Sequence, residues 1–174
     1  MTIVPSGTTS AAGKAEAQSP GETSLPHLLS TLTPSLHPST FVFLSVPQSQ
    51  FISPLPIPLS ELTLFFHEAE GITLILPLSS LQKYAPDLKY SYPSRMITCN
   101  VHSSLEAVGF MAVLSGKLAE SGISANVVSA FYHDHIFVPE GKEEEAVKVL
   151  EEVRKDTEAE LKRKGEGKKR VDEI

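Results

Sequence analysis

Side chains that can recognise charge gather in two short stretches of the chain, residues 103–109 and 133–135. Ser103 stands three residues before Glu106, which is the capping-box spacing of a helix start. The free N–H groups at a helix start carry partial positive charge and can hold a carboxylate. Glu106 and Asp134 could then face an ammonium group. Together these groups would recognise the two charges of a free amino acid.

Both carboxylates also have a purely structural explanation. Glu106 could serve only to close its capping box, and Asp134 could serve only to make a tight turn with His133. The residues alone leave both alternatives open.

Imidazole groups accompany Asp134 and could ligate zinc or another divalent ion together with it: His102, His133 and His135. However, His133 and His135 straddle a predicted turn, and the chain has no second cysteine that could help to hold a metal. We therefore expect no metal and no other cofactor.

The chain lacks the sequence patterns of common catalytic centres. It has no Ser-His-Asp order, no glycine-rich phosphate loop and no dinucleotide-binding fingerprint. Its single cysteine, Cys99, falls on the buried face of a predicted strand, where a thiol is normally inert. We expect a protein that is not an enzyme, with a metal-dependent enzyme as the third interpretation after the two given below.

The elements that must position these groups are a strand, a helix and a hairpin. Residues 96–102 alternate between apolar and polar, which is typical of a strand with one buried face. A helix is predicted from Ser103 to a left-handed cap at Gly122. Residues 123–132 and 135–138 favour strands that a turn at His133 and Asp134 joins. We expect the helix to bury one stripe, formed by Leu105, Val108, Ala112, Ser115 and Ala119 and flanked by Met111, Leu114 and Leu118.

The first half of the chain predicts a smaller set of elements. A short leucine-lined helix should precede an apolar strand at residues 41–46. Prolines at every second position mark residues 48–58 as an extended linker. Residues 61–67 and 71–76 should form a hairpin. A last amphipathic helix should pack on the sheet as far as about Val153.

Both ends of the chain are poor in large apolar side chains. We expect residues 1–23 to form a disordered arm and residues 156–174 to form a charged, fraying tail. The tail carries a basic cluster, for which a solvated chain end is the simplest explanation and a localisation or acidic-partner signal is the alternative.

Composition narrows the class of protein. The 174 residues include 41% apolar residues, which is enough for a hydrophobic core. The formal net charge of −6 argues against a nucleic-acid surface. A lone cysteine, the lack of a signal-peptide pattern and the lack of a long apolar run predict a soluble cytoplasmic protein.

Five stretches of the chain carry a resemblance to a known family: residues 36–38 (Leu-His-Pro), 68–74 (Glu-Ala-Glu-Gly-Ile-Thr-Leu), 101–109 (Val-His-Ser-Ser-Leu-Glu-Ala-Val-Gly), 122–128 (Gly-Ile-Ser-Ala-Asn-Val-Val) and 132–135 (Tyr-His-Asp-His). They resemble the signatures of the CASTOR-type ACT domain family. The resemblance extends from about Leu28 to Val153. Its departure from the family pattern is the proline-rich segment 48–58.

The resemblance implies an α+β fold with tandem ACT-like units of ferredoxin-like βαββα topology and antiparallel sheets. The first unit, residues 24–90, would lack its first long helix, and the second would span residues 91–155. Such units mostly bind amino acids or similar small ligands as regulators. The residues and the resemblance together predict these ligand-binding residues: His102, Ser103, Ser104, Leu105, Glu106, Val108, Gly109, Asn126, His133 and Asp134.

We therefore expect a non-catalytic regulatory or sensor protein that binds a small molecule, an amino acid in the first place. It would act on a partner protein or as a homo-oligomer, because two small sheets would leave surface uncovered. The main alternative is a structural or protein–protein interaction module without a ligand.

Overall fold

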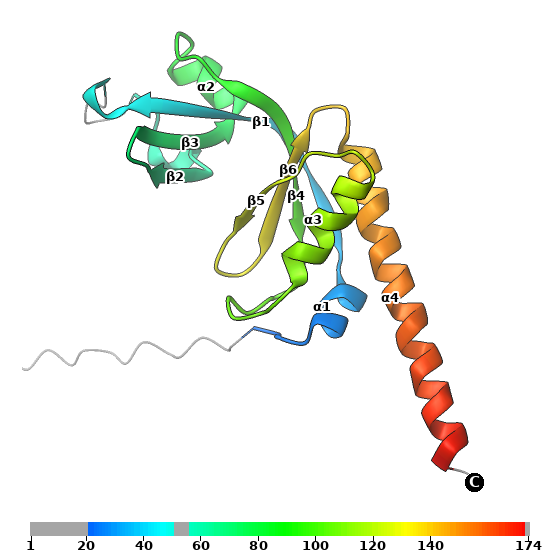
Figure 1. Ribbon diagram of the computed structural model, residues 1–174. Coiled ribbons are helices and arrows are strands. Elements are labelled where there is room, and N and C mark those ends of the chain that lie inside the picture. Colours follow the sequence, from blue (N-terminus) through cyan, green and yellow to red (C-terminus); the bar gives the residue numbers. More distant parts are fainter. Residues whose placement is uncertain (1–20, 51–55, 173–174) are drawn as a thin grey trace, which may run out of the picture.

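The chain folds around one antiparallel sheet of six strands in the order β2-β3-β1-β4-β6-β5 (Figure 1). The computed structural model describes residues 21–50 and 56–172, so residues 1–20 of the expected arm lie outside the described residues. The strands are β1 (Pro34–Pro47), β2 (Leu64–His67), β3 (Gly71–Pro77), β4 (Ser91–Cys99), β5 (Asn126–Ser129) and β6 (Asp134–Pro139). The α-helices are α1 (Leu25–Thr31), α2 (Leu78–Tyr84), α3 (Phe110–Glu120) and α4 (Glu143–Asp172).

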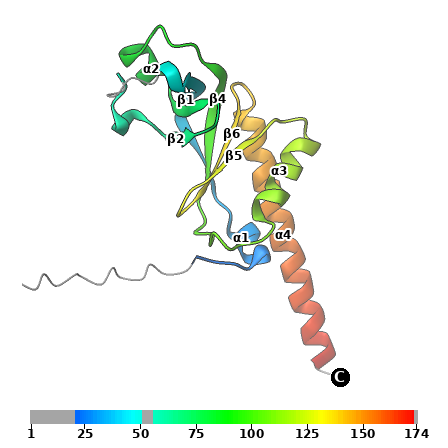
Figure 2. The ribbon, with the colours of Figure 1, turned by 60° about the vertical axis from the view of Figure 1, so that its left-hand side comes forward.

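The predicted mixed α+β fold with antiparallel pairing is confirmed. Between β1 and β2, the described residues hold only the short 3-10 helices η1 (Gln48–Gln50) and η2 (Leu59–Glu61), so the first unit lacks a long helix there. Figure 2 shows α2 beside one end of the sheet and α1, α3 and α4 at the other end.

Strand β1 is much longer than the predicted strand 41–46, and it joins what we expected to be two sheets into one. Its 14 residues pair with β3 through residues 41–47 and with β4 through residues 34–43. Because one strand is hydrogen-bonded in both halves of the molecule, the two units share a continuous backbone network.

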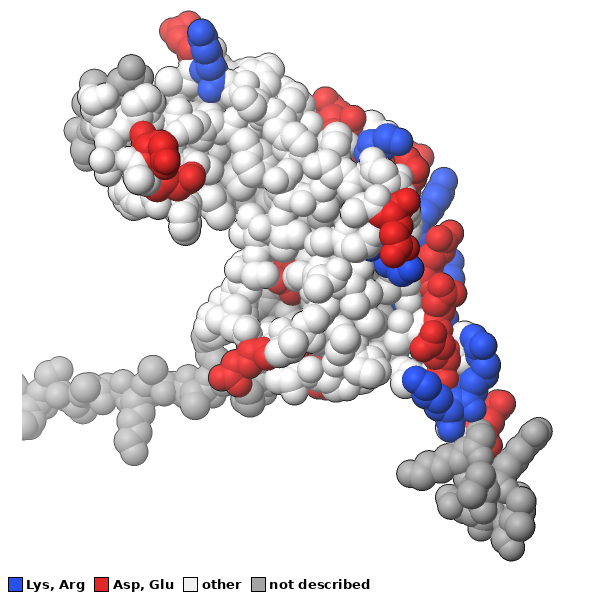
Figure 3. All heavy atoms as spheres, viewed as in Figure 1, with Lys and Arg blue, Asp and Glu red and all other residues white. Residues whose placement is uncertain are grey.

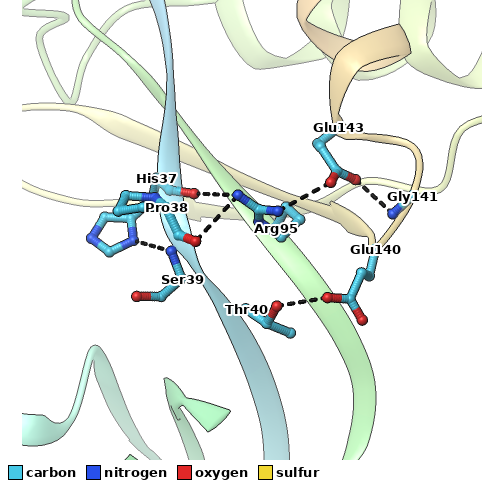
Figure 4. Close-up of polar contacts among 8 residues, drawn as sticks. All are labelled: His37, Pro38, Ser39, Thr40, Arg95, Glu140, Gly141 and Glu143. Carbon is cyan, nitrogen blue, oxygen red and sulfur yellow. Dashed lines mark hydrogen bonds and ion pairs between the residues drawn. The ribbon is translucent and has the colours of Figure 1, made fainter. Parts of the chain in front are cut away.

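A bulge interrupts β1 where the two halves meet. Leu36 pairs with Ile97 and Thr40 pairs with Arg95, so β1 has two more residues than β4 between these pairs. The guanidinium of Arg95 donates to the carbonyl groups of His37 and Pro38 in the bulge, at 3.0 and 3.3 Å (Figure 4). Arg95 thereby satisfies carbonyl groups that the bulge removes from the sheet ladder.

The same guanidinium binds the start of α4. Arg95 lies 3.1 Å from a carboxylate oxygen of Glu143, and the other oxygen accepts a hydrogen bond from the Gly141 N–H at 2.6 Å (Figure 4). Both side chains are largely buried, with 19% and 15% of their surface exposed. This pair ties the last helix to the bulge in β1.

Three clusters of apolar side chains form the core. The largest joins the sheet to α1, α3 and α4, and includes Leu28, Ile97, Phe110, Leu114, Ile136 and Leu150. A second cluster packs α2 against β1 and β3, and includes Val42, Leu44, Leu76 and Leu81. A third cluster contains Phe41, Ile75, Met96 and Phe137.

The helix predicted to begin at Ser103 begins seven residues later, at Phe110. The Ser104 hydroxyl accepts a hydrogen bond from the Glu106 N–H, and the Ala107 N–H donates to the Ser104 carbonyl, which closes a local turn instead of a helix start. Gly109 then has φ +92°, which is incompatible with the first turn of a helix. Residues 103–109 therefore form a loop.

The predicted stripe of the helix is wrong as a consequence. Val108 is 84% exposed and Leu105 is 67% exposed, because both lie in the loop. The buried stripe of α3 is Phe110, Leu114 and Leu118, so two of the residues expected to flank the stripe belong to it.

The hairpin and the C-terminal helix also differ from expectation. The turn lies at residues 130–133, and Asp134 is the first residue of β6 instead of part of the turn. Helix α4 continues through the expected tail to Asp172. Ion pairs between Arg154 and Glu158 and between Lys155 and Glu151 support its middle. Figure 3 shows that charges of both signs gather along α4, while the surface over the sheet is mostly uncharged in this view.

Candidate functional site

A pocket of about 200 Å³ lies between the loop 103–109, the first turn of α3 and the end of the β5–β6 hairpin. The residues that line it are Ser103, Ser104, Leu105, Ala107, Gly109, Phe110, Met111, Ala112, Ser129, Ala130 and Asp134. We call it the Asp134 pocket. It joins the two sequence stretches, residues 103–109 and 133–135, in which charge-recognising side chains were predicted.

Asp134 is the one acidic residue that lines this pocket. It is 6% exposed, and its carboxylate accepts hydrogen bonds from the hydroxyl groups of Ser103, at 2.9 Å, and Ser129. Among the described residues, no lysine, arginine or histidine forms an ion pair with it. Two neutral donors partly compensate its buried charge, and a cation in the pocket would complete the compensation.

The start of α3 supplies the opposite polarity. Its N-cap residue is Gly109, and no side chain in the described part of the chain forms a capping hydrogen bond there. The first intrahelical bond runs from the Val113 N–H to the Gly109 carbonyl. The N–H groups of the three residues between them therefore have no acceptor within the helix and can receive an anion.

The loop residues predicted to bind a ligand divide into two groups. Ser103, Ser104, Leu105 and Gly109 line the pocket. Glu106 and Val108 do not line it, and both are exposed. The capping role and the ligand role of Glu106 both required a helix at Ser103, and no helix begins there.

Three other predicted residues also lie outside the pocket lining. Asn126 pairs with Phe137, three residues along β5 from Ser129, so it sits at the far end of that strand. His133 shares a ring nitrogen hydrogen bond of 3.1 Å with the Val101 carbonyl. His102 is exposed, and its ring lies 5.7 Å from that of Tyr132.

Ser129 and the first turn of α3 are parts of the pocket that the sequence reasoning missed. Ser129 is directly opposite Asp134 in the register of β5 and β6, and the turn consists of Phe110, Met111 and Ala112. A correct hairpin register would have identified Ser129, because paired residues lie on the same face of a sheet.

The histidines do not gather around Asp134. His135 lies next to it on β6, on the opposite face of the sheet, and shares a 3.1 Å hydrogen bond with the Thr98 hydroxyl. Over residues 21–50 and 56–172, no group of three His, Cys, Asp or Glu side chains is arranged to hold a metal ion.

Cys99 pairs with Asp134 across β4 and β6. Burial, together with the negative charge of Asp134, raises the pKa of the Cys99 thiol to about 12. The thiol is therefore protonated at neutral pH and is a poor nucleophile.

Two sequence models of the ACT domain match the chain, one over residues 20–95 and the other over residues 91–152. The chain belongs to the ACT domain family. The tandem arrangement implied by the resemblance is thereby confirmed. Membership of the ACT family points to a regulatory role that involves binding a small molecule.

Solved structures of similar proteins agree with this fold. A Vibrio cholerae protein of unknown function, described as a possible transport protein, is 40% identical, with a TM-score of 0.63 over 75% of this chain and 95% of that chain. A protein from Agobacterium tumefaciens is 13% identical, with a TM-score of 0.59 over 71% of this chain and 89% of that chain. No curated protein sequence matches the chain. None of the helices in the described part of this ACT protein is long and apolar enough to cross a membrane.

Proposed function

We propose that this ACT protein is a non-catalytic regulator that binds a small amino acid in the Asp134 pocket. Binding would report the presence of the amino acid to a partner protein or to a second copy of the chain. The observation that carries the proposal is a buried carboxylate that has no cationic partner within residues 21–50 and 56–172, in the same pocket as a helix start without a side-chain cap.

The charges of the pocket support a zwitterionic ligand. The ligand ammonium would bind the Asp134 carboxylate and complete its set of hydrogen-bond donors. The ligand carboxylate would bind the free N–H groups of the first turn of α3. A ligand with only one of these charges would leave the other half of the pocket uncompensated.

The volume of the pocket supports a small ligand. Pockets for drug-sized molecules measure roughly 300–1,000 Å³, whereas this one measures about 200 Å³. Glycine, alanine, serine and threonine are therefore the first candidates. The likeness of the motifs to CASTOR-type members also supports an amino acid.

The polar groups around Asp134 support binding without catalysis. The Ser103 and Ser129 hydroxyl groups both donate to the carboxylate. A carboxylate alone is a weak base towards a hydroxyl group, and activation of a serine nucleophile typically needs a histidine beside it. Of the two histidines next to Asp134 in the sequence, His135 faces the other side of the sheet and the His133 ring bonds the Val101 carbonyl.

Calorimetry on the full chain with glycine, L-alanine, L-serine and L-threonine tests the proposal. Asp134→Asn keeps the size of the side chain but removes the charge. We expect it to weaken binding about 10- to 100-fold, which corresponds to losing one charge-assisted hydrogen bond.

Glu106→Gln is the matched control, because it removes the same charge from an exposed residue outside the pocket. It should bind as the wild type does. If none of the four amino acids binds the wild type, or if Asp134→Asn binds as tightly, the proposed ligand site is wrong.

Exposed apolar side chains favour the interaction module as a second candidate function. Leu105 and Val108 in the loop, and Phe131 and Tyr132 in the hairpin turn, are each at least half exposed. A second copy of the chain could cover them. Light scattering on the wild type and on Val108→Ser, without amino acids, would then give a dimer for the wild type and a weaker dimer for the variant.

A further inference from the structure

We propose that Gly21 and Glu22 position the wall of the Asp134 pocket, so that the end of the N-terminal arm controls ligand affinity. This inference rests on the proposed function. The sequence predicts these two residues to be part of a disordered arm, but they lie against the loop 103–109. In Figure 1 the blue segment that leads to α1 passes beneath the green loop that leads to α3.

Two backbone hydrogen bonds join Glu22 to the start of the loop. The Glu22 N–H donates to the His102 carbonyl at 2.8 Å, and the Ser104 N–H donates to the Glu22 carbonyl at 2.9 Å. They form a parallel bridge between Glu22 and Ser103.

Ser103 carries this contact into the pocket. The residues on either side of it, His102 and Ser104, form the two hydrogen bonds to Glu22. The Ser103 hydroxyl itself donates to the Asp134 carboxylate at 2.9 Å. A displacement of the loop backbone would therefore move one of the two hydroxyl donors away from the proposed ammonium-binding carboxylate.

Gly21 is the residue that allows this close approach. A Cβ atom at position 21 would lie 2.5 Å from the Ser104 nitrogen and 2.7 Å from the Ser103 carbonyl carbon. Both are backbone atoms, which cannot rotate out of the way as a side-chain end can. Any other residue at position 21 would force the arm and the loop apart.

The far end of the loop lies close to the same N-terminal segment. A Cβ atom at Gly109 would lie 3.3 Å from a methyl group of Leu25, the first residue of α1. The Glu22 carboxylate accepts hydrogen bonds from the Thr23 and Ser24 N–H groups, which fixes the path from the bridge into α1. Residues 21–25 thus bond to the start of the loop that lines the pocket and lie close to its end.

A displaced arm would lower the fraction of molecules in which the loop has the conformation that binds the ligand. If only a fraction of the molecules holds the loop in place, the apparent Kd rises by the inverse of that fraction. A variant that leaves the loop in place in about one molecule in ten would bind about 10-fold more weakly.

Gly21→Ala in the full chain tests the inference, with Gly116→Ala as the matched control. Gly116 lies in α3, and a Cβ atom there meets nothing within 4 Å. Calorimetry with L-alanine, L-serine and L-threonine should give an apparent Kd about 10-fold higher for Gly21→Ala and unchanged for Gly116→Ala. Glu22→Pro, which removes the N–H that donates to His102, should act in the same direction as Gly21→Ala.

Amide hydrogen exchange supplies a readout that needs no ligand. The Ser104 amide should exchange faster in Gly21→Ala than in the wild type, while the amides of β4 within the sheet keep their protection. Unchanged exchange at Ser104 would overturn the inference even if no amino acid binds. Faster exchange with an unchanged Kd would also overturn it. If the wild type binds none of the amino acids but the Ser104 amide exchanges faster in Gly21→Ala, only the proposed function and the effect on affinity are overturned.

Discussion

Asp134 and His135 are neighbours on β6, but their side chains lie on opposite faces of the sheet. Asp134 faces the pocket beside α3, and His135 bonds the Thr98 hydroxyl on the other face. The two residues therefore have separate roles. We propose that Asp134 binds the ligand, and we expect His135 to affect the pH dependence of stability.

His135 should make the protein less stable in mild acid. Partial burial, with a smaller contribution from His133, lowers the pKa of His135 from its ordinary value of 6.5, against an opposing contribution from Asp134. The unfolded chain then binds the proton more tightly than the folded one. The free energy of unfolding should fall as the pH drops below about 6.5 towards the lowered pKa, and this contribution should be fully regained above pH 6.5.

Urea unfolding between pH 7.5 and 5 measures this effect. The wild type should lose more stability over that range than His135→Gln does. His67→Gln, at an exposed position at the end of β2, is the control and should follow the wild type. Parallel curves for the wild type and His135→Gln would show that His135 does not contribute.

Val108 should respond to substitution in the opposite way to that predicted by a helix beginning at Ser103, and Leu114, which was expected to flank the stripe of that helix, is the buried reference. Val108 is exposed in the loop, so Val108→Asp should change the free energy of unfolding by about 0.5 kcal/mol or less. Leu114 is fully buried between α3 and the sheet, so Leu114→Ala should cost about 2–5 kcal/mol. Urea denaturation of both variants measures these changes. If Val108→Asp unfolds the protein, Val108 is part of the core and its exposed position in the loop is wrong.

At the scale of the elements, the contact between the β1 bulge and α4 depends on Arg95. Its guanidinium is shared between two bulge carbonyl groups and the Glu143 carboxylate. Its Nε atom is buried and has no partner among the described residues. The side chain is therefore held by its two terminal nitrogens.

Arg95→Met should destabilise the protein by about 3 kcal/mol, because it leaves the largely buried Glu143 without its cation. Lys142→Met is a matched control, since the ion pair between Lys142 and Glu145 is about half exposed. Its loss should cost about 0.5 kcal/mol. Thermal or urea unfolding measures both, and equal effects would mean that the Arg95 pair contributes no more than a surface pair.

At the scale of the whole molecule, the continuous sheet should make the two ACT units unfold together. Strand β1 is hydrogen-bonded to β3 in one unit and to β4 in the other. Phe41 on β1 also packs against Phe137 on β6, with ring centroids 5.7 Å apart. Neither unit can keep its core if the other releases β1.

Urea unfolding should therefore show one cooperative transition. Leu76→Ala in the first unit and Leu114→Ala in the second should each move that single transition to lower urea. Far-ultraviolet circular dichroism and the alkylation of Cys99, which is buried in the second unit, should report the same midpoint. Two resolved transitions would contradict the shared role of β1.

The sequence by itself determined the class of fold and most of the strands. Alternating or continuous apolar residues indicated strands near β1, β3, β4 and β6, because the buried face of a sheet selects apolar side chains whatever the neighbouring strands are. The resemblance of the motifs indicated the ACT family, and local composition indicated the missing long helix of the first unit. These features depend on residues that are close together in the chain.

Only the tertiary structure decided where α3 begins and which residues form the pocket. Ser103 and Glu106 have the spacing of a capping box, but contact with Glu22 and the positive φ of Gly109 hold the segment as a loop. Ser129 reaches Asp134 only through the register of β5 on β6. Local propensity amounts to less than about 1 kcal/mol per residue, so contacts between distant segments override it, and those contacts cannot be read from the spacing of residues within one stretch.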